Sequence, residues 1–203
     1  MNEGRDERPI SWDWGNEVLY RMCREEPGHT DVDIIAAKLW LIGRSYAAQI
    51  ERRSGERGES DALYADAARL IKASHLDEWM NDVSQIRRLD SSNIGLALAV
   101  HSRLVKLLHK CTRLNRRSFA SKYLHFHTPT AFFIFDSRAS AAIRQKVKRR
   151  RVTIPPSCAE SDLEYAAFVL RCILYRDEMP GDLTPRQIDA ELLGYRCGEV
   201  HVR

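Results

Sequence analysis

The chain has 203 residues, of which 44% are hydrophobic and 30% charged, the composition of an ordinary globular protein that can bury a core. No apolar run approaches the roughly 18 residues that a membrane span needs, and the first ten residues are too charged for a signal peptide. We therefore expect a cytoplasmic protein without a membrane partner.

Helical periodicity and helix start and stop signals dominate the chain. Residues 1–10 are expected to form a flexible N-terminus, and residues 11–203 a single α-helical domain. Gly55 and Gly58 mark a flexible loop. Apart from the apolar run 132–135, nothing predicts a strand, so we expect an all-α fold without a significant sheet. Helices are predicted over residues 31–53, in one or two segments within 62–89, and over 94–111, 119–127, from 136 or 137 to 151, 162–176 and 185–195.

The five cysteines are odd in number and include no C-x-x-C pair, which argues against a disulfide framework and a zinc ribbon. We expect them to be reduced and mostly buried. His125 and His127 would point to different sides of a helix, and a metal site needs three or more converging ligands. We expect neither a metal nor a cofactor.

The positive charge is concentrated in one segment. Residues 101–151 contain fourteen lysines and arginines but a single carboxylate, Asp136, for a net charge of +13 within a total of +4. Such a segment is typical of a surface that binds polyanions, above all nucleic acid. The alternative is a solvated helical face paired with the acidic remainder. The candidate phosphate-binding residues are Arg113, Arg116, Arg117, Arg138, Lys146, Lys148, Arg149 and Arg150.

Lys122 and Asp136 are the candidate catalytic pair. They lie on either side of a helix end marked by Thr128 and Pro129 and of an apolar stretch that can exclude water. Arginines near Lys122 would destabilise its ammonium form and make it a better amine nucleophile, and a fixed carboxylate can stabilise an oxocarbenium-like sugar. These are properties that a glycosyl-transfer site needs. The alternative is an ordinary ion pair in which Asp136 also caps the next helix.

The segment LNRRSFASKYLHFHTPTAFFIFDSR, residues 114–138, resembles the helix-hairpin-helix-GPD superfamily of DNA glycosylases, in particular small bacterial proteins similar to 8-oxoguanine DNA glycosylase/lyase. Those enzymes carry a hairpin, a helix with a nucleophilic lysine, and a proline-containing turn that ends in a catalytic aspartate. Residues 38–53 and 184–195 also look like segments of this group. The resemblance implies a helical bundle-like glycosylase fold, with Lys122 and Asp136 as the catalytic residues and DNA as a partner. It also implies a place in a bacterial antiphage system, with a protein partner there.

Two features depart from the family pattern. Residues 101–151 contain no glycine, whereas the family's hairpin is glycine-rich so that its amides can approach a phosphate. The family's lysine would fall nearer Ser118, one helical turn before Lys122, and residues four apart share one helix face. A non-catalytic module that keeps the fold and binds nucleic acid or an acidic protein is therefore the main alternative.

Three further groups of side chains are candidates. Tyr123, His125 and His127 are candidates for stacking on or hydrogen-bonding to a flipped base, with core packing as the alternative. Arg103 and His109 match the loose Arg-x5-His pattern of HEPN ribonucleases, which gives a second enzymatic alternative. Four polar residues of an otherwise well-packed helix either line the pocket or are exposed: Arg44, Tyr46, Glu51 and Arg52.

Together these features predict a DNA glycosylase/lyase-like protein that acts on a purine base in DNA or on a nucleoside. Lys122 would be the nucleophile and Asp136 its electrostatic partner. The binding module and the HEPN-like ribonuclease stay open as alternatives.

Overall fold

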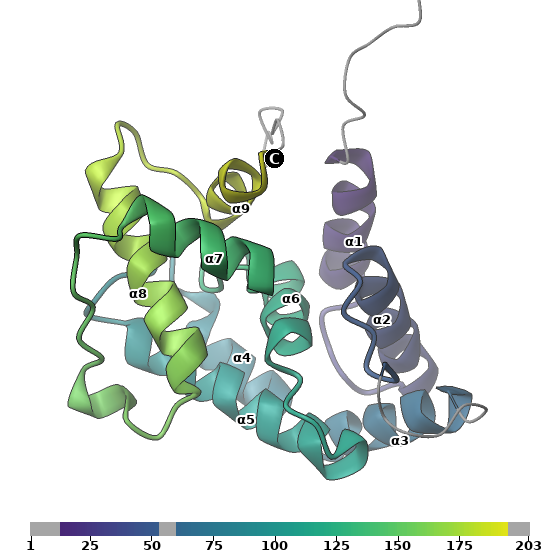
Figure 1. The fold of residues 1–203 in the computed structure, drawn as a ribbon. Coiled ribbons are helices and arrows are strands. Elements are labelled where there is room, and N and C mark those ends of the chain that lie inside the picture. Colours follow the sequence, from purple (N-terminus) through teal and green to yellow (C-terminus); the bar gives the residue numbers. More distant parts are fainter. Residues whose placement is uncertain (1–12, 53–59, 195–203) are drawn as a thin grey trace, which may run out of the picture.

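A computed structural model describes residues 13–52 and 60–194, and these residues form nine α-helices and one short 3-10 turn (Figure 1). The N-terminal residues 1–10, predicted to be flexible, lie outside the described residues, as do Gly55, Gly58 and Cys197. The helices are α1 (Asp13–Glu25), α2 (Val32–Ser45), α3 (Ser60–Lys72), α4 (Leu76–Ser84), α5 (Ile94–Thr112), α6 (Arg117–His127), α7 (Ser137–Lys146), α8 (Leu163–Glu178) and α9 (Pro185–Leu193), with the 3-10 turn η1 (Pro156–Cys158) between α7 and α8.

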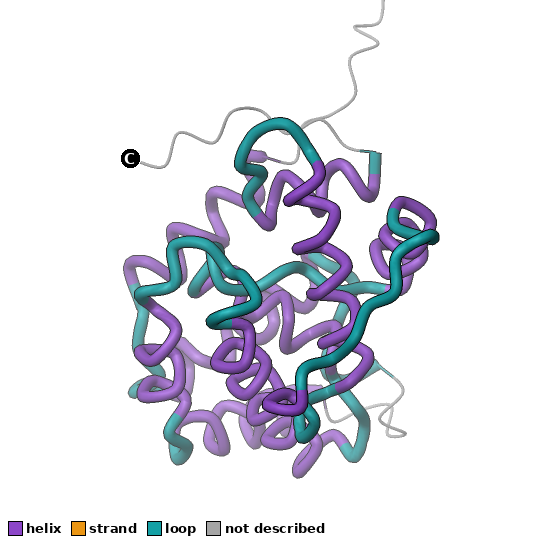
Figure 2. Tube along the Cα trace, turned by 90° about the vertical axis from the view of Figure 1, so that its left-hand side faces the viewer, coloured by secondary structure: helices purple, strands orange, loops and turns teal. Residues whose placement is uncertain are grey.

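The predicted all-α class is confirmed. Within residues 13–52 and 60–194 there is no strand, and Figure 2 shows only helices joined by loops. The apolar run 132–135 forms no strand and lies in a buried loop between α6 and α7. Its aromatic side chains are buried in the core, and the Phe135 ring packs against Phe168 of α8. The run is also bonded through its backbone, since the Phe132 carbonyl contacts His125 of α6 and the Phe133 carbonyl contacts Tyr165 of α8.

Helix α6 lies in the middle of the molecule. It contacts α5, α1 and α2, while α7 packs on α8 and α9 (Figure 1). Figure 1 shows α1 and α2 on one side of α6 and α7 to α9 on the other. The buried apolar side chains from α1 to α9 form one continuous core. The helix that carries Lys122 is therefore held between two groups of helices.

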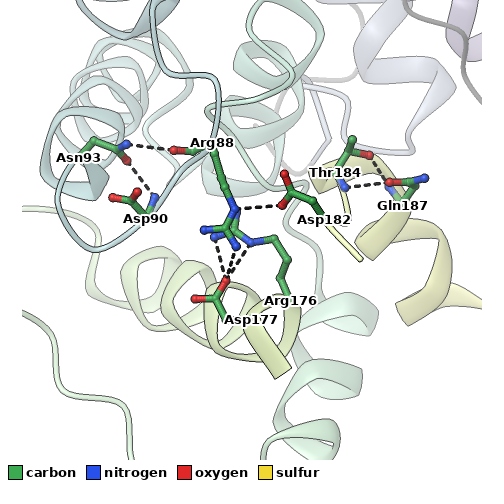
Figure 3. A network of polar contacts seen from close by, with 8 residues as sticks. All are labelled: Arg88, Asp90, Asn93, Arg176, Asp177, Asp182, Thr184 and Gln187. Atoms are coloured by element: carbon green, nitrogen blue, oxygen red, sulfur yellow. Dashed lines mark hydrogen bonds and ion pairs between the residues drawn. The ribbon is translucent and has the colours of Figure 1, made fainter. Parts of the chain in front are cut away.

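Local start signals place several helices where the sequence predicts them. Asp31 caps α2 by accepting from the backbone N–H groups of Asp33 and Ile34. Thr184 and Gln187 form a reciprocal capping box at the start of α9. Figure 3 shows this box beside a network in which Arg88 joins Asp177 and Asp182. The connection between α8 and α9 is thus fixed by polar contacts to the loop after α4.

The prediction of one helix over residues 31–53 is wrong at its end. Helix α2 stops at Ser45, and Ala47 adopts a left-handed φ of 49°. Ala48 donates its N–H to the carbonyl of Gly43, so the chain folds back over the last turn. A Cβ on Gly43 would lie 3.3 Å from Gln49 Cα, so glycine is what permits this close return. The fold-back places Tyr46 and the residues after it at the functional site.

The predicted helix through residue 151 is also too long. Helix α7 ends at Lys146, and the cations at 148–151 follow in an exposed connection. Val147 directly follows the helix, and its N–H donates to the Ile143 carbonyl. Its side chain is buried in the core. A helix that continued through the cations at 148–151 would hold like charges close together on its surface, which destabilises a helix.

Helix α1 was not predicted. Its buried residues are Asn16, Leu19, Tyr20 and Cys23, and this spacing is the signal that could have found it. The helix packs against α2 and α6. Within the described residues, Cys23, Cys111, Cys158 and Cys172 form no disulfide, and three of these four cysteines are buried. In the described part of the chain no helix is both long enough and apolar enough to cross a bilayer.

Candidate active site

A cavity of about 1050 Å³ lies where the ends of α1, α2, α6, α7 and α9 meet. Its wall includes residues from both groups of helices that flank α6. Polar and charged side chains are prominent in it, among them Asn16, Tyr46, Arg116, Asp136, Arg186 and Asp189. This volume is of the size that proteins use to enclose small ligands.

Asp136 lies at the wall of this cavity as the N-cap of α7. Its Oδ1 accepts from the N–H of Ala139 at 2.8 Å, and its side chain is 31% exposed. The carboxylate is therefore held at the positive end of the α7 dipole, where a negative charge is stabilised. The Asp136 Oδ2 atom lies 3.9 Å from Lys122 Nζ.

Lys122 is buried directly behind the same wall. Its side chain is 1% exposed, and Nζ donates to Ser118 Oγ at 2.9 Å and to the Phe135 carbonyl at 2.7 Å. Nζ also lies 6.0 Å from the centre of the Tyr46 ring. Lys122 itself does not line the cavity, but Tyr46, Ser118, Phe135 and Asp136 all do. The amine thus contacts residues of the cavity wall but does not line the cavity itself.

Burial lowers the pKa of Lys122 from 10.5 to about 8, although Asp136 and Asp189 both act to raise it. The main cause of this lower pKa is desolvation of the ammonium group. The sequence analysis expected neighbouring arginines to be the cause. An amine with a pKa near 8 has an appreciable neutral fraction at physiological pH. Lys122 and Asp136 are thus brought together as predicted, with the amine held further from solvent.

The loop before Asp136 is pinned from two helices. Ser121 Oγ accepts from Phe135 N–H at 3.0 Å, and the Phe135 carbonyl accepts from Ser118 Oγ at 3.0 Å. Tyr165 in α8 donates its hydroxyl to the Phe133 carbonyl at 2.9 Å. These bonds fix the backbone that leads into Asp136, so the carboxylate is positioned by α6 and α8 as well as by α7.

None of the three predicted base-contacting residues lines the cavity: Tyr123 and His125 lie in the core, and His127 is partly buried. His125 donates from Nδ1 to the Phe132 carbonyl at 2.7 Å and accepts at Nε2 from Tyr20 at 2.6 Å. Tyr123 is fully buried and donates its hydroxyl to His29 Nε2 at 2.8 Å. His127 packs against the Tyr123 ring at a centroid distance of 4.6 Å. Their contacts hold the fold around α6, and burial lowers the pKa of His125 to about 4 and that of His127 to about 3.

Some of the predicted phosphate-binding residues are paired with acidic side chains, and others are not. Three are engaged with acids: Arg117 bonds Asp162 and Glu164 at 2.6 Å each, Lys146 lies 3.5 Å from Glu191, and Arg150 bonds Glu178 at 2.6 Å. For these three residues the structure matches the alternative in which basic side chains pair with acidic residues elsewhere in the chain. Lys148 and Arg149 are exposed after the end of α7. Arg113 ends α5 in a left-handed conformation and lines a second hollow, of about 520 Å³, between α3 and α5.

Arg116 and Arg138 are the two predicted cations that line the cavity. Arg138 is exposed in the first turn of α7. Arg116 is partly buried at the start of α6, and its Nε and Nη2 atoms have no hydrogen-bond partner among residues 13–52 and 60–194. Burial lowers the pKa of this guanidinium from its ordinary value. The Nε–Nη2 edge is the one that binds planar acceptors in a bidentate manner.

Several cavity residues escaped the sequence analysis. Asn16 lies in the unpredicted helix α1, and Arg186 and Asp189 lie in α9, 35 and 38 residues beyond the end of the basic segment at residue 151. Of the four polar residues after Trp40 that were left undecided, Tyr46 and Arg52 line the cavity. Arg44 and Glu51 form an ion pair with one another at 2.6 Å. No local spacing connects these positions, because tertiary packing alone brings α1 and α9 to Asp136.

Arg103 and His109 lie on α5, and neither lines the cavity. Both side chains are exposed, and the Arg103 guanidinium lies 5.4 Å from the centre of the Trp79 ring. Six residues along a helix place two side chains on different faces.

Comparison of the chain with models of known protein families, with curated proteins and with solved structures finds no significant match.

Proposed function

We propose that the protein cleaves the N-glycosidic bond of a purine nucleoside unit, in DNA or as a free nucleoside, in the cavity beside Asp136. The observation that carries this proposal is the pairing of a cavity-lining carboxylate with a buried amine 3.9 Å behind it. Such a pair supplies both a negative charge for an oxocarbenium-like sugar and a nucleophile for its C1′. The resemblance of residues 114–138 to DNA glycosylase/lyases supports the same chemistry.

In the proposed reaction the bond from C1′ to the base nitrogen breaks, and its electron pair leaves with the base. Asp136 stabilises the positive charge that develops on the sugar. The neutral amine of Lys122 then bonds to C1′, and its proton passes to the departing base. Opening of the sugar ring gives an iminium between C1′ and Lys122. Lys122 reaches C1′ by moving through the layer formed by Ser118 and Phe135.

A non-catalytic nucleic-acid-binding protein is the second candidate. It is favoured by one observation: Nζ of Lys122 is 1% exposed and already bonded to Ser118 and Phe135. In that case Lys122 and Asp136 would stabilise the helix junction, and Arg116, Arg138, Lys148 and Arg149 would bind phosphates. The HEPN-like ribonuclease stays a third proposal and predicts RNA cleavage that is lost in His109→Ala.

The test is base release from purine-containing oligonucleotides and nucleosides, including 8-oxoguanine substrates, by wild type and Asp136→Asn. Asn can keep the cap on α7 but removes the charge. We expect release by the wild type and about a 1,000-fold lower rate in the variant, the upper range for losing one preorganised electrostatic contact. Substrate affinity should change little. Tight binding without release by the wild type would favour the binding protein.

A further inference from the structure

Three polar side chains in the cavity wall each have at least one nitrogen or oxygen atom without a hydrogen-bond partner within the described residues. Arg116 and Asn16 present unpaired donors, at Nε and Nη2 and at Nδ2, while Asp189 presents an unpaired Oδ1. Asn16 and Asp189 are each more than nine-tenths buried. Buried polar atoms without partners are costly, and their concentration in one cavity points to a ligand that satisfies them.

Asp189 is the one acid among these three residues. Its side chain is 1% exposed, and Oδ2 is bonded to Nη1 of Arg186 one turn earlier on α9 at 2.5 Å. Asp189 lines the same cavity as Asp136, and its Oδ1 is buried without a hydrogen-bond partner within the described residues. Helix α9 is held against α7, and the network around Arg88 shown in Figure 3 anchors the loop before it. Two carboxyl groups from different helices therefore converge on one cavity.

We propose that Asp189 is a second catalytic carboxyl group and that it donates a proton to N7 of the departing purine. This inference rests on the proposed N-glycoside cleavage. N7 is the ring acceptor that adenine and guanine share. As the bond from C1′ to N9 breaks, its electron pair enters the base, and the Asp189 O–H group gives its proton to N7. In this form of the reaction the proton that Lys122 loses on bonding to C1′ passes to solvent instead of to the base. The resulting carboxylate stays paired with Arg186, and solvent restores its proton after the base leaves.

The charged and titratable groups around Asp189 suit this role. Arg186 faces it from α9, Lys122 from α6, Asp136 from the start of α7 and Cys172 from α8. Desolvation raises the pKa of Asp189 to about 6, against the opposing effects of Arg186 and Lys122 and with the support of Asp136. A carboxyl group with such a pKa keeps its proton below about pH 6 and a minor fraction of it at neutral pH. A site that keeps two carboxyl groups in different protonation states can use one as the acid and the other as the charge stabiliser.

The test combines one change in the protein with one change in the substrate and compares their separate and joint effects on base release. Single-turnover base release is measured with oligonucleotides that carry a purine deoxynucleoside or its 7-deaza counterpart, for wild type and Asp189→Asn. Each change alone should slow release about 100-fold, the lower end for general acid catalysis. Both together should slow release no further than either alone, because they remove the same proton transfer. The wild-type rate should fall as the pH rises through about 6, and the variant should lose that dependence.

Glu191→Gln is the matched control, since Glu191 is a carboxylate on the same helix that pairs with Lys146 and does not line the cavity. This variant should release base at the wild-type rate. Release of the 7-deaza purine at the parent rate, or multiplied effects of the two changes, would overturn the assignment of Asp189.

A wild type that releases no base would contradict the proposed function, and binding then decides the role of Asp189 separately. If protonated Asp189 contacts N7, the parent oligonucleotide should bind about tenfold more tightly than its 7-deaza counterpart at pH 5.5. That preference should disappear at pH 7.5 and in Asp189→Asn. Equal affinities at both values of pH would show that Asp189 does not contact the base.

Discussion

The protein buries two lysines, and their surroundings differ. Lys38 in α2 is fully buried, and its Nζ donates to the carbonyls of Glu26 and Gly28 in the connection between α1 and α2. Lys122 in α6 is equally buried but lies behind a cavity wall, 3.9 Å from Asp136. Burial lowers the pKa of both ammonium groups. Desolvation alone therefore does not distinguish a functional lysine from a structural one.

The difference lies in the partners. Lys38 donates to two main-chain carbonyls and so fixes a loop, and it does not line the cavity beside Asp136. Lys122 donates to Ser118 Oγ and to the Phe135 carbonyl, which also accepts from Ser118, and it lies 3.9 Å from a carboxylate at the cavity wall. The loop at Phe135 would keep a hydrogen bond without Lys122. The contacts of Lys122 are therefore less necessary for the fold than those of Lys38.

The largest expected effect of replacing these lysines is on activity. Lys122→Met should lower base release about 1,000-fold, in line with the loss of a nucleophile and its charge, whereas Lys38→Met should leave the rate within about threefold of the wild type. The comparison is made by single-turnover release at saturating protein. Equal losses of activity in the two variants would remove the distinction between the lysines.

Stability should respond in the opposite order. Lys38→Met should lower the free energy of unfolding by about 3 kcal/mol, since two hydrogen bonds to a charged group contribute about 1.5 to 3 kcal/mol each and part is offset by the desolvation that is relieved. Lys122→Met should leave it unchanged or raise it, because a pKa of about 8 means that the buried ammonium is held at a cost. Urea unfolding of both variants checks this. A strong loss of stability in Lys122→Met would identify Lys122 as a structural residue.

Histidine 125 extends the comparison to a third desolvated group on α6. His125 lies one turn after Lys122 but contacts Tyr20 and Phe132 in the core, so its burial should affect stability and not catalysis. Its folded-state pKa of about 4 lies below the ordinary 6.5, so the unfolded chain binds a proton that the folded chain does not. Its stabilisation is complete above pH 6.5 and is lost as the pH falls towards 4.

The measurement is the free energy of unfolding at pH 7 and pH 5 for wild type and His125→Asn. The wild type should be less stable at pH 5, and His125 should account for about 2 kcal/mol of the difference, from about 1.4 kcal/mol per pKa unit. In His125→Asn the drop between the two values of pH should be smaller by that amount. An identical drop in both proteins would contradict the assignment of a neutral buried His125.

The smallest effects concern cations outside the cavity. Arg149 has no ion pair among residues 13–52 and 60–194, whereas Arg150 is bonded to Glu178 at 2.6 Å. If the basic segment binds phosphates, Arg149→Gln should make the slope of log DNA affinity against log salt concentration less steep by about one unit. The binding free energy lost near 0.1 M salt should be less than about 1 kcal/mol. Arg150→Gln should change the slope less. Equal slopes in wild type and both variants would place the DNA away from this connection.

The sequence predicts the elements that local signals control. Capping residues mark the starts of α2, α7 and α9, and the pairing of Lys122 with Asp136 follows from a helix, a proline-marked turn and a capping aspartate in succession. These features depend on neighbours within about 15 residues. They are visible without knowledge of the tertiary structure.

The rest of the site depends on packing between distant segments. Asn16 and Asp189 meet Asp136 only because α1 and α9 both pack beside the central helices, and no spacing in the chain indicates this. His125 illustrates the converse: the sequence predicts it in a base pocket, but its side chain lies in the core. Gly43 shows why the end of α2 was missed, since the close return of Gln49 is a tertiary contact.

The central claim is that Lys122 is the amine nucleophile of an N-glycoside-cleaving site. Its most direct test is borohydride reduction during reaction with duplex and single-stranded oligonucleotides that carry 8-oxoguanine or an abasic site, followed by proteolysis and mass spectrometry of the adduct. The account predicts a sugar-derived adduct on Lys122 that is absent in Lys122→Met and present in Lys38→Met. An adduct on another lysine, or base release by the wild type without any adduct, would contradict it.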